Sequence, residues 1–460
     1  MPDTLDTDSL IEAASRHLWQ NYFSDKEEVK RPQVLVRGEG LYVYDSEGKR
    51  YLDTFASLLT TLCGHGRREV IDAVTQQMEK LAFFPSGYDC IMEPTVKLAE
   101  KLAEVTPGEL SVSFFVQDGS EASEAAIKLA RNYHWVRGEK QRTKILFRRY
   151  SYHGATLGAL SVSGLPSLRE PFEPMVPGGV SVMPARCYRC ELNLKPETCN
   201  LTCLRNLEAT VEWEGANSIA AIIMDPVPGS NTGFPPPPAG YLQGVRDLCD
   251  KHGILLLFDE IQVGFGRTGK WFACEHWDVT PDILAVAKGF SGGYLPLGAA
   301  IATKQIADAF REAGAGFRHV HTYNGHATAC AAALANLEII QNENLVQRSA
   351  ELGDYLKQRL ESLYKHPLVG DVRGMGTLWA VELVADRETR APLSPAGKVG
   401  SLVNDWCRRN GMILRNNGDL LVMAPALVMT NEQADEMVDG LDKAIEAAAR
   451  EFAAQTSTPA

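Results

Sequence analysis

The sequence predicts an α/β protein whose mainly parallel central sheet is flanked by helices, with a smaller α+β domain built from both chain ends. From about residue 112 to about residue 325, short apolar runs that suit buried strands alternate with helical patterns. This alternation is typical of a mostly parallel sheet with helices on both faces. After a long helical stretch that begins at residue 326, shorter elements follow in a different order, which indicates a second folding unit.

The opening elements precede this alternation. The chain is expected to be helical and then irregular up to about residue 40. A hairpin is expected at 40–53, because a Ser-Glu-Gly turn separates two runs of alternating apolar residues. Apolar residues at helical spacing predict helices at 68–81 and 94–105.

The strands and helices of the large unit follow in order. Strands are expected at 114–117, 144–148, 219–225, 254–259, 283–287 and 297–303. Helices are expected at 120–136, 241–252 and 304–313. Beyond residue 326, strands are expected near 369–373, 377–384, 412–415 and 420–423, and helices at 398–409 and 431–452. We therefore divide the chain into an N-terminal segment of the small domain (1–65), a large domain (66–335) and a C-terminal small domain (336–460).

Composition and charge narrow the classes of function. The formal net charge of −12 provides no electrostatic basis for binding nucleic acid or an anionic membrane. The acidic first residues do not resemble a secretory signal, and no apolar run approaches the roughly 20 residues of a membrane helix. We expect a soluble, cytoplasmic protein without nucleic-acid or membrane partners.

The ten cysteines fall into two groups. Six are scattered, as expected for small buried residues in a reducing compartment. The other four cluster as Cys187-x-x-Cys190 and Cys199-x-x-x-Cys203, which looks like half of a zinc-site pattern. Free thiols or a disulfide are favoured over a structural metal, and no metal site is included in the predicted functional residues.

The stretch 254–288 carries the most chemical information. One apolar run ends at Asp259 and a second ends directly before Lys288. Open α/β sheets build ligand sites at the carboxyl ends of their strands, so a carboxylate and an amine would meet there. A lysine can form a Schiff base with an aldehyde cofactor, and a buried carboxylate can keep a pyridine nitrogen protonated. Alternatively, Lys288 is a surface lysine and Asp259 caps a turn.

Three further motifs follow predicted strands or precede helices. Gly119 and Ser120 offer backbone N–H groups and a hydroxyl for a phosphate, although a plain N-cap at Ser120 is favoured on local sequence. Tyr152 could cover a cofactor ring or be an ordinary core tyrosine. Thr322 offers another phosphate hydroxyl or an N-terminal cap.

At this point the sequence resembles a known family, the class III (ω-type) pyridoxal-phosphate-dependent aminotransferases of fold type I. The resemblance runs from about residue 30 to about residue 450. It rests on Asp-Glu-Ile-Gln-Val-Gly-Phe-Gly-Arg-Thr-Gly from Asp259, Thr-Pro-Asp-Ile-Leu-Ala-Val-Ala-Lys-Gly from Thr280, and Thr-Tyr-Asn-Gly-His from Thr322. These motifs are specific in combination.

The resemblance implies pyridoxal 5′-phosphate as cofactor and assigns its catalytic contacts. Lys288 matches the Schiff-base lysine, which also moves the substrate proton. Asp259 matches the partner of the pyridine nitrogen. Ile261 and Tyr152 match the residues on the two ring faces, and Gln262 matches the partner of the phenolic oxygen.

The resemblance also assigns the phosphate contacts and the assembly. Gly119 and Ser120 match the phosphate loop. Thr322 matches a phosphate ligand that the neighbouring subunit contributes. The family therefore implies a homodimer with shared active sites, and whether dimers pair into tetramers is left open.

Substrate contacts are implied as well. Arg415 aligns with the mobile arginine that binds the keto acid carboxylate, the alternative being a solvated arginine at a strand end. Leu59, Phe84 and Tyr152 fall among pocket-lining positions, and Leu59 leaves room for a bulky amine. The family usually has Glu-Pro where this chain has Asp225-Pro226, and we expect the shorter side chain to hold Arg415 differently.

The expected function is a ping-pong aminotransferase that cycles pyridoxal phosphate and pyridoxamine phosphate. It would move an amino group from a primary amine or ω-amino acid to a keto acid, with pyruvate favoured over 2-oxoglutarate. One alternative is a dialkylglycine-decarboxylase-like or epimerase-like member. Another is a catalytically silent cofactor-binding protein, against which the intact set of Lys288, Asp259, Gln262 and Thr322 argues.

Overall fold

The central element is a seven-stranded sheet. The computed structural model describes residues 6–20, 31–87 and 89–456. The strand order is β4-β10-β9-β8-β7-β5-β6. The strands are β4 (Leu110–Val116), β5 (Lys144–Arg148), β6 (Gly179–Val182), β7 (Ile219–Met224), β8 (Leu255–Asp259), β9 (Ile283–Val286) and β10 (Gly298–Thr303). Strands β5 to β9 pair in parallel, and β10 runs antiparallel to β4 and β9, so the expected mainly parallel sheet is confirmed.

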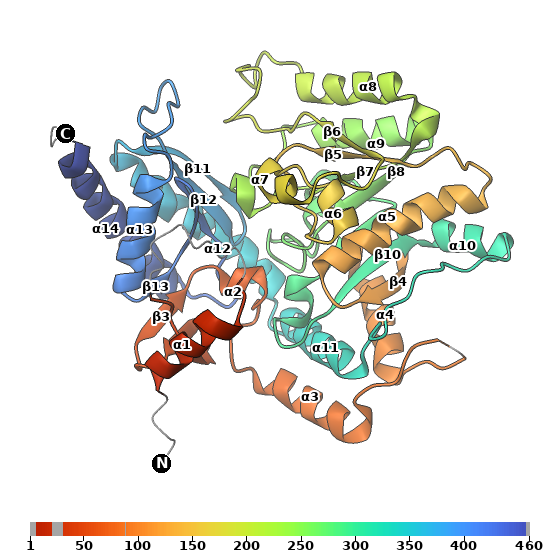
Figure 1. The fold of residues 1–460 in the computed structure, drawn as a ribbon, viewed down its shortest axis with the longest axis horizontal. Coiled ribbons are helices and arrows are strands. Elements are labelled where there is room, and N and C mark those ends of the chain that lie inside the picture. Colours follow the sequence, from red (N-terminus) through yellow and green to blue (C-terminus); the bar gives the residue numbers. More distant parts are fainter. Residues whose placement is uncertain (1–5, 21–30, 88, 457–460) are drawn as a thin grey trace.

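Helices cover both faces of this sheet (Figure 1). They are α4 (Glu93–Val105), α5 (Gly119–Val136), α8 (Thr202–Glu214), α9 (Tyr241–His252), α10 (Lys304–Glu312) and α11 (Ala327–Asn342). Every residue of β7 is buried, and its side chains alternate between two apolar clusters. Ile222 and Met224 face the cluster that contains α4, α8, α9 and α11, whereas Ile223 faces α5 and α10. Burial on both faces explains the continuous apolar strands of the sequence.

Both chain ends form the smaller unit. A four-stranded sheet has the order β1-β2-β3-β13, with β1 (Leu35–Glu39), β2 (Tyr42–Asp45), β3 (Arg50–Asp53) and β13 (Met412–Ile413). Because β3 pairs in parallel with β13, the N-terminal segment is tied to the C-terminal one. Figure 1 shows the red N-terminal elements beside the blue C-terminal ones. The smaller α+β domain from both ends is therefore confirmed.

A third sheet completes this unit. Its order is β11-β12-β15-β14, with β11 (Val369–Met375), β12 (Leu378–Leu383), β14 (Arg415–Asn417) and β15 (Leu420–Met423), all antiparallel. The helices α12 (Leu345–Glu361), α13 (Lys398–Arg409) and α14 (Asn431–Thr456) accompany it. The remaining helices are α1 (Thr7–His17), α2 (Ala56–Leu59), α3 (Arg68–Leu81), α6 (Leu157–Ser161) and α7 (Pro166–Arg169). Short 3₁₀ helices are η1 (Glu170–Phe172), η2 (Ala216–Ser218), η3 (Ser230–Thr232), η4 (Ala273–Trp277), η5 (Lys288–Ser291) and η6 (Ser362–Lys365).

Several expected elements need correction. The helical stretch from residue 326 is two helices, because Asn344 adopts a left-handed φ of +52° between α11 and α12. Strands β1 and β6 and helix α8 were not predicted. Thr430 is the cap of α14, since its Oγ1 accepts a hydrogen bond from the Gln433 N–H at 3.2 Å. Within the described ranges, no helix has the length and apolar character that crossing a bilayer requires.

Candidate active site

Five strands deliver polar side chains to one edge of the large sheet. Asp118 follows β4 within two residues, and His153 lies in the segment after β5. Asp225 directly follows β7, Asp259 ends β8, and Lys288 comes two residues after β9. These strands run parallel to one another, so their carboxyl ends meet at the same edge, where ligands bind in open α/β sheets.

Lys288 lies in a strained and partly buried position. It begins η5 with a left-handed φ of +50°, which is unusual for a residue with a side chain. Burial lowers the pKa of its amine from the ordinary value, and the Asp259 carboxylate offsets part of this shift. A lowered pKa increases the fraction of neutral amine, which is the form that attacks a carbonyl.

Asp259 is fixed by two hydrogen bonds. Its Oδ2 accepts from Nδ1 of His153 at 2.7 Å, and its Oδ1 accepts from the Ile261 N–H at 3.0 Å. Both Asp259 and His153 are buried. His153 received no role from the sequence, although it lies next to Tyr152 in the chain. It orients the carboxylate that the sequence singled out.

Asp225 completes a buried polar cluster. Its Oδ1 lies 3.7 Å from His153 Nδ1, and its Oδ2 lies 3.6 Å from Arg148 Nη2. Burial raises the pKa of the Asp225 carboxyl to about 6, an effect that His153 opposes. Burial lowers the pKa of His153, but Asp225 and Asp259 more than offset this, so the net shift is upward. The expectation that Asp225 holds Arg415 is wrong, because its ion pairs are with His153 and Arg148.

The start of α5 offers free backbone donors. Asp118, not Ser120, is the N-cap, since its side chain accepts from the Glu121 N–H at 2.9 Å. Gly119 and Ser120 therefore begin the first turn, where N–H groups precede any intrahelical acceptor. A Cβ on Gly119 would lie 3.1 Å from the Ile261 side chain, so the two are in contact.

Gly154 brings a second loop against this helix start. It has a φ of +137°, and a Cβ there would lie 2.8 Å from the Cα of Ser120. The Ala155 N–H donates to Ser120 Oγ at 3.1 Å. A side chain at position 154 would push the two loops apart, so the glycine permits the close approach.

A cavity of about 440 Å³ opens beside Lys288. It is lined by Leu58, Leu59, Tyr152, Leu165, Ser167, Leu168, Ser230, Asn231, Gln262, Lys288, Arg415 and Asn417. The structure thus brings together five of the predicted site residues, namely Leu59, Tyr152, Gln262, Lys288 and Arg415. The other lining residues had no signal in the sequence, because they come from segments without a recognisable motif.

Phe84 and Thr322 lie elsewhere. Phe84 is 48% exposed and Thr322 is exposed, and neither lines the cavity that contains Lys288. Their contacts with substrate and phosphate stay predictions, and the contact of Thr322 is predicted for the site of the neighbouring subunit.

Leu58 and Leu59 are presented by an unusual turn. The four residues of α2, Ala56–Leu59, all have φ between +43° and +71°. Left-handed turns of residues with side chains cost roughly 1–2 kcal/mol per residue. The Asp53 carboxylate offsets this by accepting from the Phe55 N–H at 3.2 Å and the Ser57 N–H at 2.7 Å. Asp53 therefore determines where the leucine wall of the cavity stands.

Arg415 is held in the cavity without an anionic partner. Its guanidinium carbon lies 5.5 Å from the centre of the Phe55 ring. Its Nε is buried and has no hydrogen-bond partner. Across the described ranges, no carboxylate lies within 4.0 Å of the guanidinium. A partly buried cation without a counter-ion is unfavourable, so its position favours binding of an anion.

Comparison with known proteins places this geometry in a family. The model for aminotransferase class-III matches residues 23–445. The chain belongs to the class III aminotransferases. An adenosylmethionine-8-amino-7-oxononanoate aminotransferase from Geobacter sulfurreducens is 39% identical over 97% of this chain and 99% of its own. A putrescine–pyruvate aminotransferase from Pseudomonas aeruginosa is 34% identical over 89% of each chain.

A solved structure agrees. The (S)-enantioselective ω-transaminase from Thermomicrobium roseum matches with a TM-score of 0.92 at 40% identity, over 96% of this chain and 98% of its own. The class III fold predicted from the sequence, fold type I, is thus confirmed. Class III aminotransferases use pyridoxal 5′-phosphate (PLP), so this enzyme is PLP-dependent and moves an amino group from an amine to a keto acid.

The donor set of the class III site suits this cofactor. Gln262 lines the cavity, and the Ser230 N–H donates to its Oε1 at 3.1 Å, so the hydrogen-bonding role of the Nε2 amide is that of a donor. An amine at Lys288, a carboxylate at Asp259 and a helix N-terminus at Gly119 match an aldehyde, a pyridine nitrogen and a phosphate, respectively.

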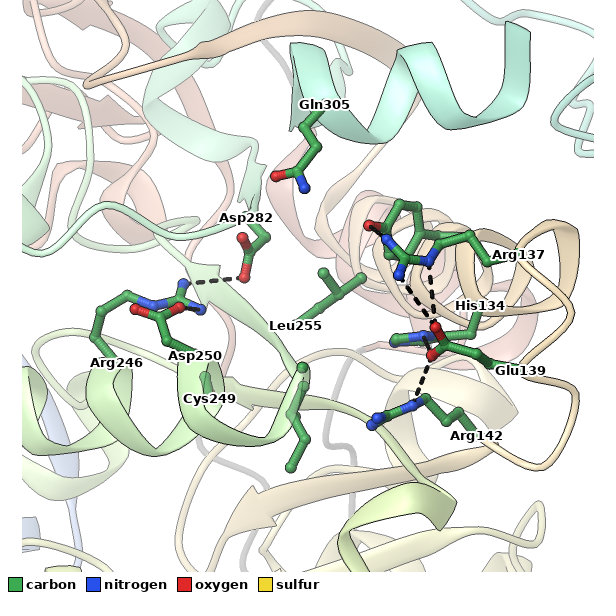
Figure 2. Close-up of a pocket in the computed structure, with 13 residues that line it drawn as sticks. His134, Arg137, Glu139, Arg142, Arg246, Cys249, Asp250, Leu255, Asp282 and Gln305 are labelled. Atoms are coloured by element: carbon green, nitrogen blue, oxygen red, sulfur yellow. Dashed lines mark hydrogen bonds and ion pairs between the residues drawn. The ribbon is translucent and has the colours of Figure 1, made fainter. Parts of the chain in front are cut away.

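A second pocket of similar size is not part of the class III active site (Figure 2). Its volume is about 430 Å³, and it contains Leu255 at the start of β8, so it lies at the opposite end of the strands from Asp259. Figure 2 shows that its charges pair with one another. Arg246 Nη1 lies 2.9 Å from Asp282, and Arg142 Nε lies 2.8 Å from Glu139. These pairs connect the ends of helices and strands. The thiol of Cys249 also lines the pocket, but burial raises its pKa and so disfavours the reactive thiolate.

Proposed function

We propose that this enzyme transfers the amino group of a primary amine or ω-amino acid to pyruvate in a ping-pong reaction. The observation that carries the proposal is the composition of the 440 Å³ cavity. Four leucines line it, here called the leucine wall, and Arg415 is the lining cation that we propose to bind the substrate.

The choice of keto acid follows from charge. The cations that line the cavity in this chain are Arg415 and Lys288, and Lys288 is the group proposed to react with the cofactor. Arg415 can hold one carboxylate through two parallel hydrogen bonds. The second carboxylate of 2-oxoglutarate would have no cation to meet it, so a monocarboxylate such as pyruvate is favoured.

The choice of amine follows from the same surface. No aspartate or glutamate is among the described residues that line the cavity. A donor with a second positive charge, such as putrescine or adenosylmethionine, would therefore lack a counter-charge. A donor with one amine and an apolar body fits the leucine wall, which includes Leu58, Leu59, Leu165 and Leu168.

The proposed roles follow from the contacts. Lys288 would hold the cofactor aldehyde through its amine and would move a proton at the substrate carbon. Asp259, oriented by His153, holds the proton on the pyridine nitrogen. When bound, PLP withdraws electrons from the substrate carbon and stores the amino group between the two half-reactions.

The other proposed roles concern binding. Ile261 and Tyr152 hold the two faces of the ring, and Gln262 donates to the phenolic oxygen. Gly119 and Ser120 bind the phosphate through the N-terminus of α5. The leucine wall excludes water from the substrate.

We propose a homodimer in which the partner contributes Thr322 to the phosphate site and Phe84 to the substrate cavity. The two segments that carry these residues adjoin, because the rings of Phe83 and Tyr323 lie 5.1 Å apart. Large apolar side chains are exposed there, with Ile91 at 81% and Val320 at 79%. Such a surface is typical of a protein interface. The molar mass from light scattering distinguishes a dimer from a tetramer.

Mixing two variants tests the shared site. A Lys288→Ala subunit and a Thr322→Ala subunit each form defective homodimers. Their mixed dimer would contain one intact site, built from the lysine of one subunit and the threonine of the other. Activity that rises on mixing supports the shared site, whereas strictly additive activity contradicts it.

We also propose the domain division stated above, 1–65 with 336–460 and 66–335. The separate apolar clusters of the large sheet and of the β11–β12–β15 sheet support it. Limited proteolysis that cuts first near residues 65 and 335 would agree with this division.

The function is tested with a panel of donors. Monoamines, ω-amino acids, putrescine and adenosylmethionine are each paired with pyruvate or 2-oxoglutarate, and alanine or glutamate formation is followed. We expect alanine from apolar monoamines to form fastest. Faster turnover of the dicationic donors, or glutamate as the main product, contradicts the proposed specificity. Release of carbon dioxide or racemisation without keto acid consumption would instead indicate a decarboxylase-like or epimerase-like reaction.

A further inference from the structure

Four cysteines lie in the segment that connects β6 to the first turn of α8, here named the four-cysteine loop (residues 187–203). Cys187 and Cys190 are separated by two residues, Cys199 precedes α8, and Cys203 lies in its first turn. All four side chains are partly buried and line one cavity of about 30 Å³. That volume is about the share of one water molecule in the liquid, so the cavity has room for a single ion and not for an organic ligand.

The surroundings of this cavity are mostly apolar and include one cation. Leucine, proline and methionine make up half of the residues that line it, and Thr202 is there as well as the cysteines. Arg186 also lines it, and no carboxylate of the described residues lies within 4.0 Å of its guanidinium. An anionic group in the cavity would supply the missing charge.

Helix α8 adds to this positive environment. Its N-terminal turn contains Cys203, and the partial positive charge of a helix N-terminus favours a thiolate over a thiol. A thiophilic cation would bind that thiolate.

We propose that the four cysteines of this loop bind one structural Zn²⁺ ion. Two closely spaced cysteine pairs are the usual ligands of a closed tetrahedral zinc site. Four thiols would each lose a proton to solvent as four Zn–S bonds form, giving a complex with net charge −2. The unpaired Arg186 and the N-terminus of α8 lie where they would stabilise that charge.

Zinc binding would contract the loop. Tetrahedral Zn–S bonds of about 2.3 Å place the sulfur atoms about 3.8 Å apart. No three of these four sulfur atoms, all within the described chain, lie mutually within 4.8 Å. The loop must therefore close around the cavity by ångströms, and this closure is a measurable consequence of binding.

The site would brace a contact between the two domains. Tyr188 and Arg189 lie between the first two cysteines, and Arg189 Nε is 2.5 Å from the Glu382 carboxylate on β12. The Tyr188 carbonyl accepts from Arg390 Nη1 at 2.7 Å. Strand β12 pairs with β15, and β15 pairs with β14, whose first residue is Arg415. Zinc would thus fix the large sheet against the sheet that carries Arg415, without taking part in the reaction.

Metal analysis of the PLP-loaded enzyme is the first test. Cells are grown with zinc, and the protein is purified under argon with a reductant and without chelators. We expect about one Zn²⁺ per chain, released by a mercurial reagent. The double variant Cys187→Ser/Cys190→Ser should contain less than about a tenth of that amount. Cys90→Ser, which changes an exposed cysteine outside the loop, should keep its zinc.

Cobalt titration keeps the proposal testable if the double variant does not fold. Wild-type protein stripped of metal and fully reduced is titrated with Co²⁺ alone. A sulfur-to-cobalt charge-transfer band that saturates at about one equivalent, with slower hydrogen exchange across residues 187–203, supports the site. The proposal is overturned if no such band appears, if all four thiols stay reactive toward a disulfide reagent in excess Zn²⁺, or if mass spectrometry of the anaerobic protein finds them joined as disulfides.

Discussion

Replacing Arg415 by leucine should separate the two half-reactions. Arg415 and Lys288 are the cations among the described residues that line the cavity. A hydrogen bond to a charged group contributes about 1.5–3 kcal/mol, and a carboxylate would receive two from a guanidinium. Taking about 3 kcal/mol as the loss in the transition state, kcat/KM for pyruvate should fall roughly 10²-fold. An apolar amine does not use this charge, so its half-reaction should change less than about threefold.

The folded protein should tolerate this change. Arg415 Nε is buried without a partner, which costs about 1–3 kcal/mol, whereas the contact with the Phe55 ring returns about 0.5–1 kcal/mol. The free energy of unfolding of Arg415→Leu should therefore not decrease by more than about 1 kcal/mol.

Single-turnover absorbance measurements, one for each half-reaction, check this prediction. Arg415→Lys keeps the charge without the planar fork and should lie between wild type and Arg415→Leu. Arg450→Leu, which changes an exposed arginine of α14, serves as control. Equal losses in both half-reactions would refute the assignment of Arg415 to the keto acid carboxylate.

Three other predictions follow from the same geometry. Lys288→Ala should lose the visible absorption of the PLP-loaded enzyme and its transaminase activity, whereas Lys304→Ala on the exposed start of α10 should keep both; retained activity in Lys288→Ala would defeat the assignment. Asp225→Asn removes a carboxyl whose pKa burial raises to about 6. A raised folded-state pKa contributes stability below the ordinary value of 3.8, and this contribution is lost as the pH rises through about 6, so wild-type apoenzyme should lose up to about 3 kcal/mol over that window that the variant does not lose. Urea unfolding of both proteins at several pH values checks this, and parallel curves would contradict it. Gly154→Ala should cost about 2–3 kcal/mol of stability and weaken PLP binding, because its Cβ would lie 2.8 Å from Ser120 Cα. Gly138 has a φ of +85° but open space around it, so Gly138→Ala should lower the free energy of unfolding by only about 1 kcal/mol. Equal losses of stability in the two variants would show that the contact with Ser120 is unimportant.

The placement of Asp259 and Lys288 at one edge of the sheet was predictable because its signals are local. Asp259 and Lys288 each end or follow a continuous apolar run, and parallel strands bring such positions to one edge without further information. The same reasoning located Tyr152. This prediction did not require the pairing register of neighbouring strands, since only the positions of the strand ends determine which residues meet at the site.

The supporting contacts were not predictable from one chain. His153 orients Asp259 across 106 positions of sequence, and nothing local distinguishes it from an ordinary buried histidine. The left-handed turn at Ala56–Leu59 contains no glycine, so its conformation depends on hydrogen bonds to Asp53 that appear only after folding. Strand β6 has only four residues, two of which are exposed, so it is too short to show a clear hydrophobic pattern in the sequence. The contacts of Thr322 and Phe84 were not predictable for another reason: we propose that both residues contribute to the active site of a second subunit.

Covalent trapping tests the central claim most directly. The PLP-loaded enzyme is reduced with borohydride, digested and mapped by mass spectrometry. The geometry predicts a pyridoxyl-phosphate label on Lys288, and a control reduction after removal of PLP should leave that lysine unlabelled. A label on another lysine, or a protein that takes up no label after incubation with PLP, would contradict the active site described for this enzyme.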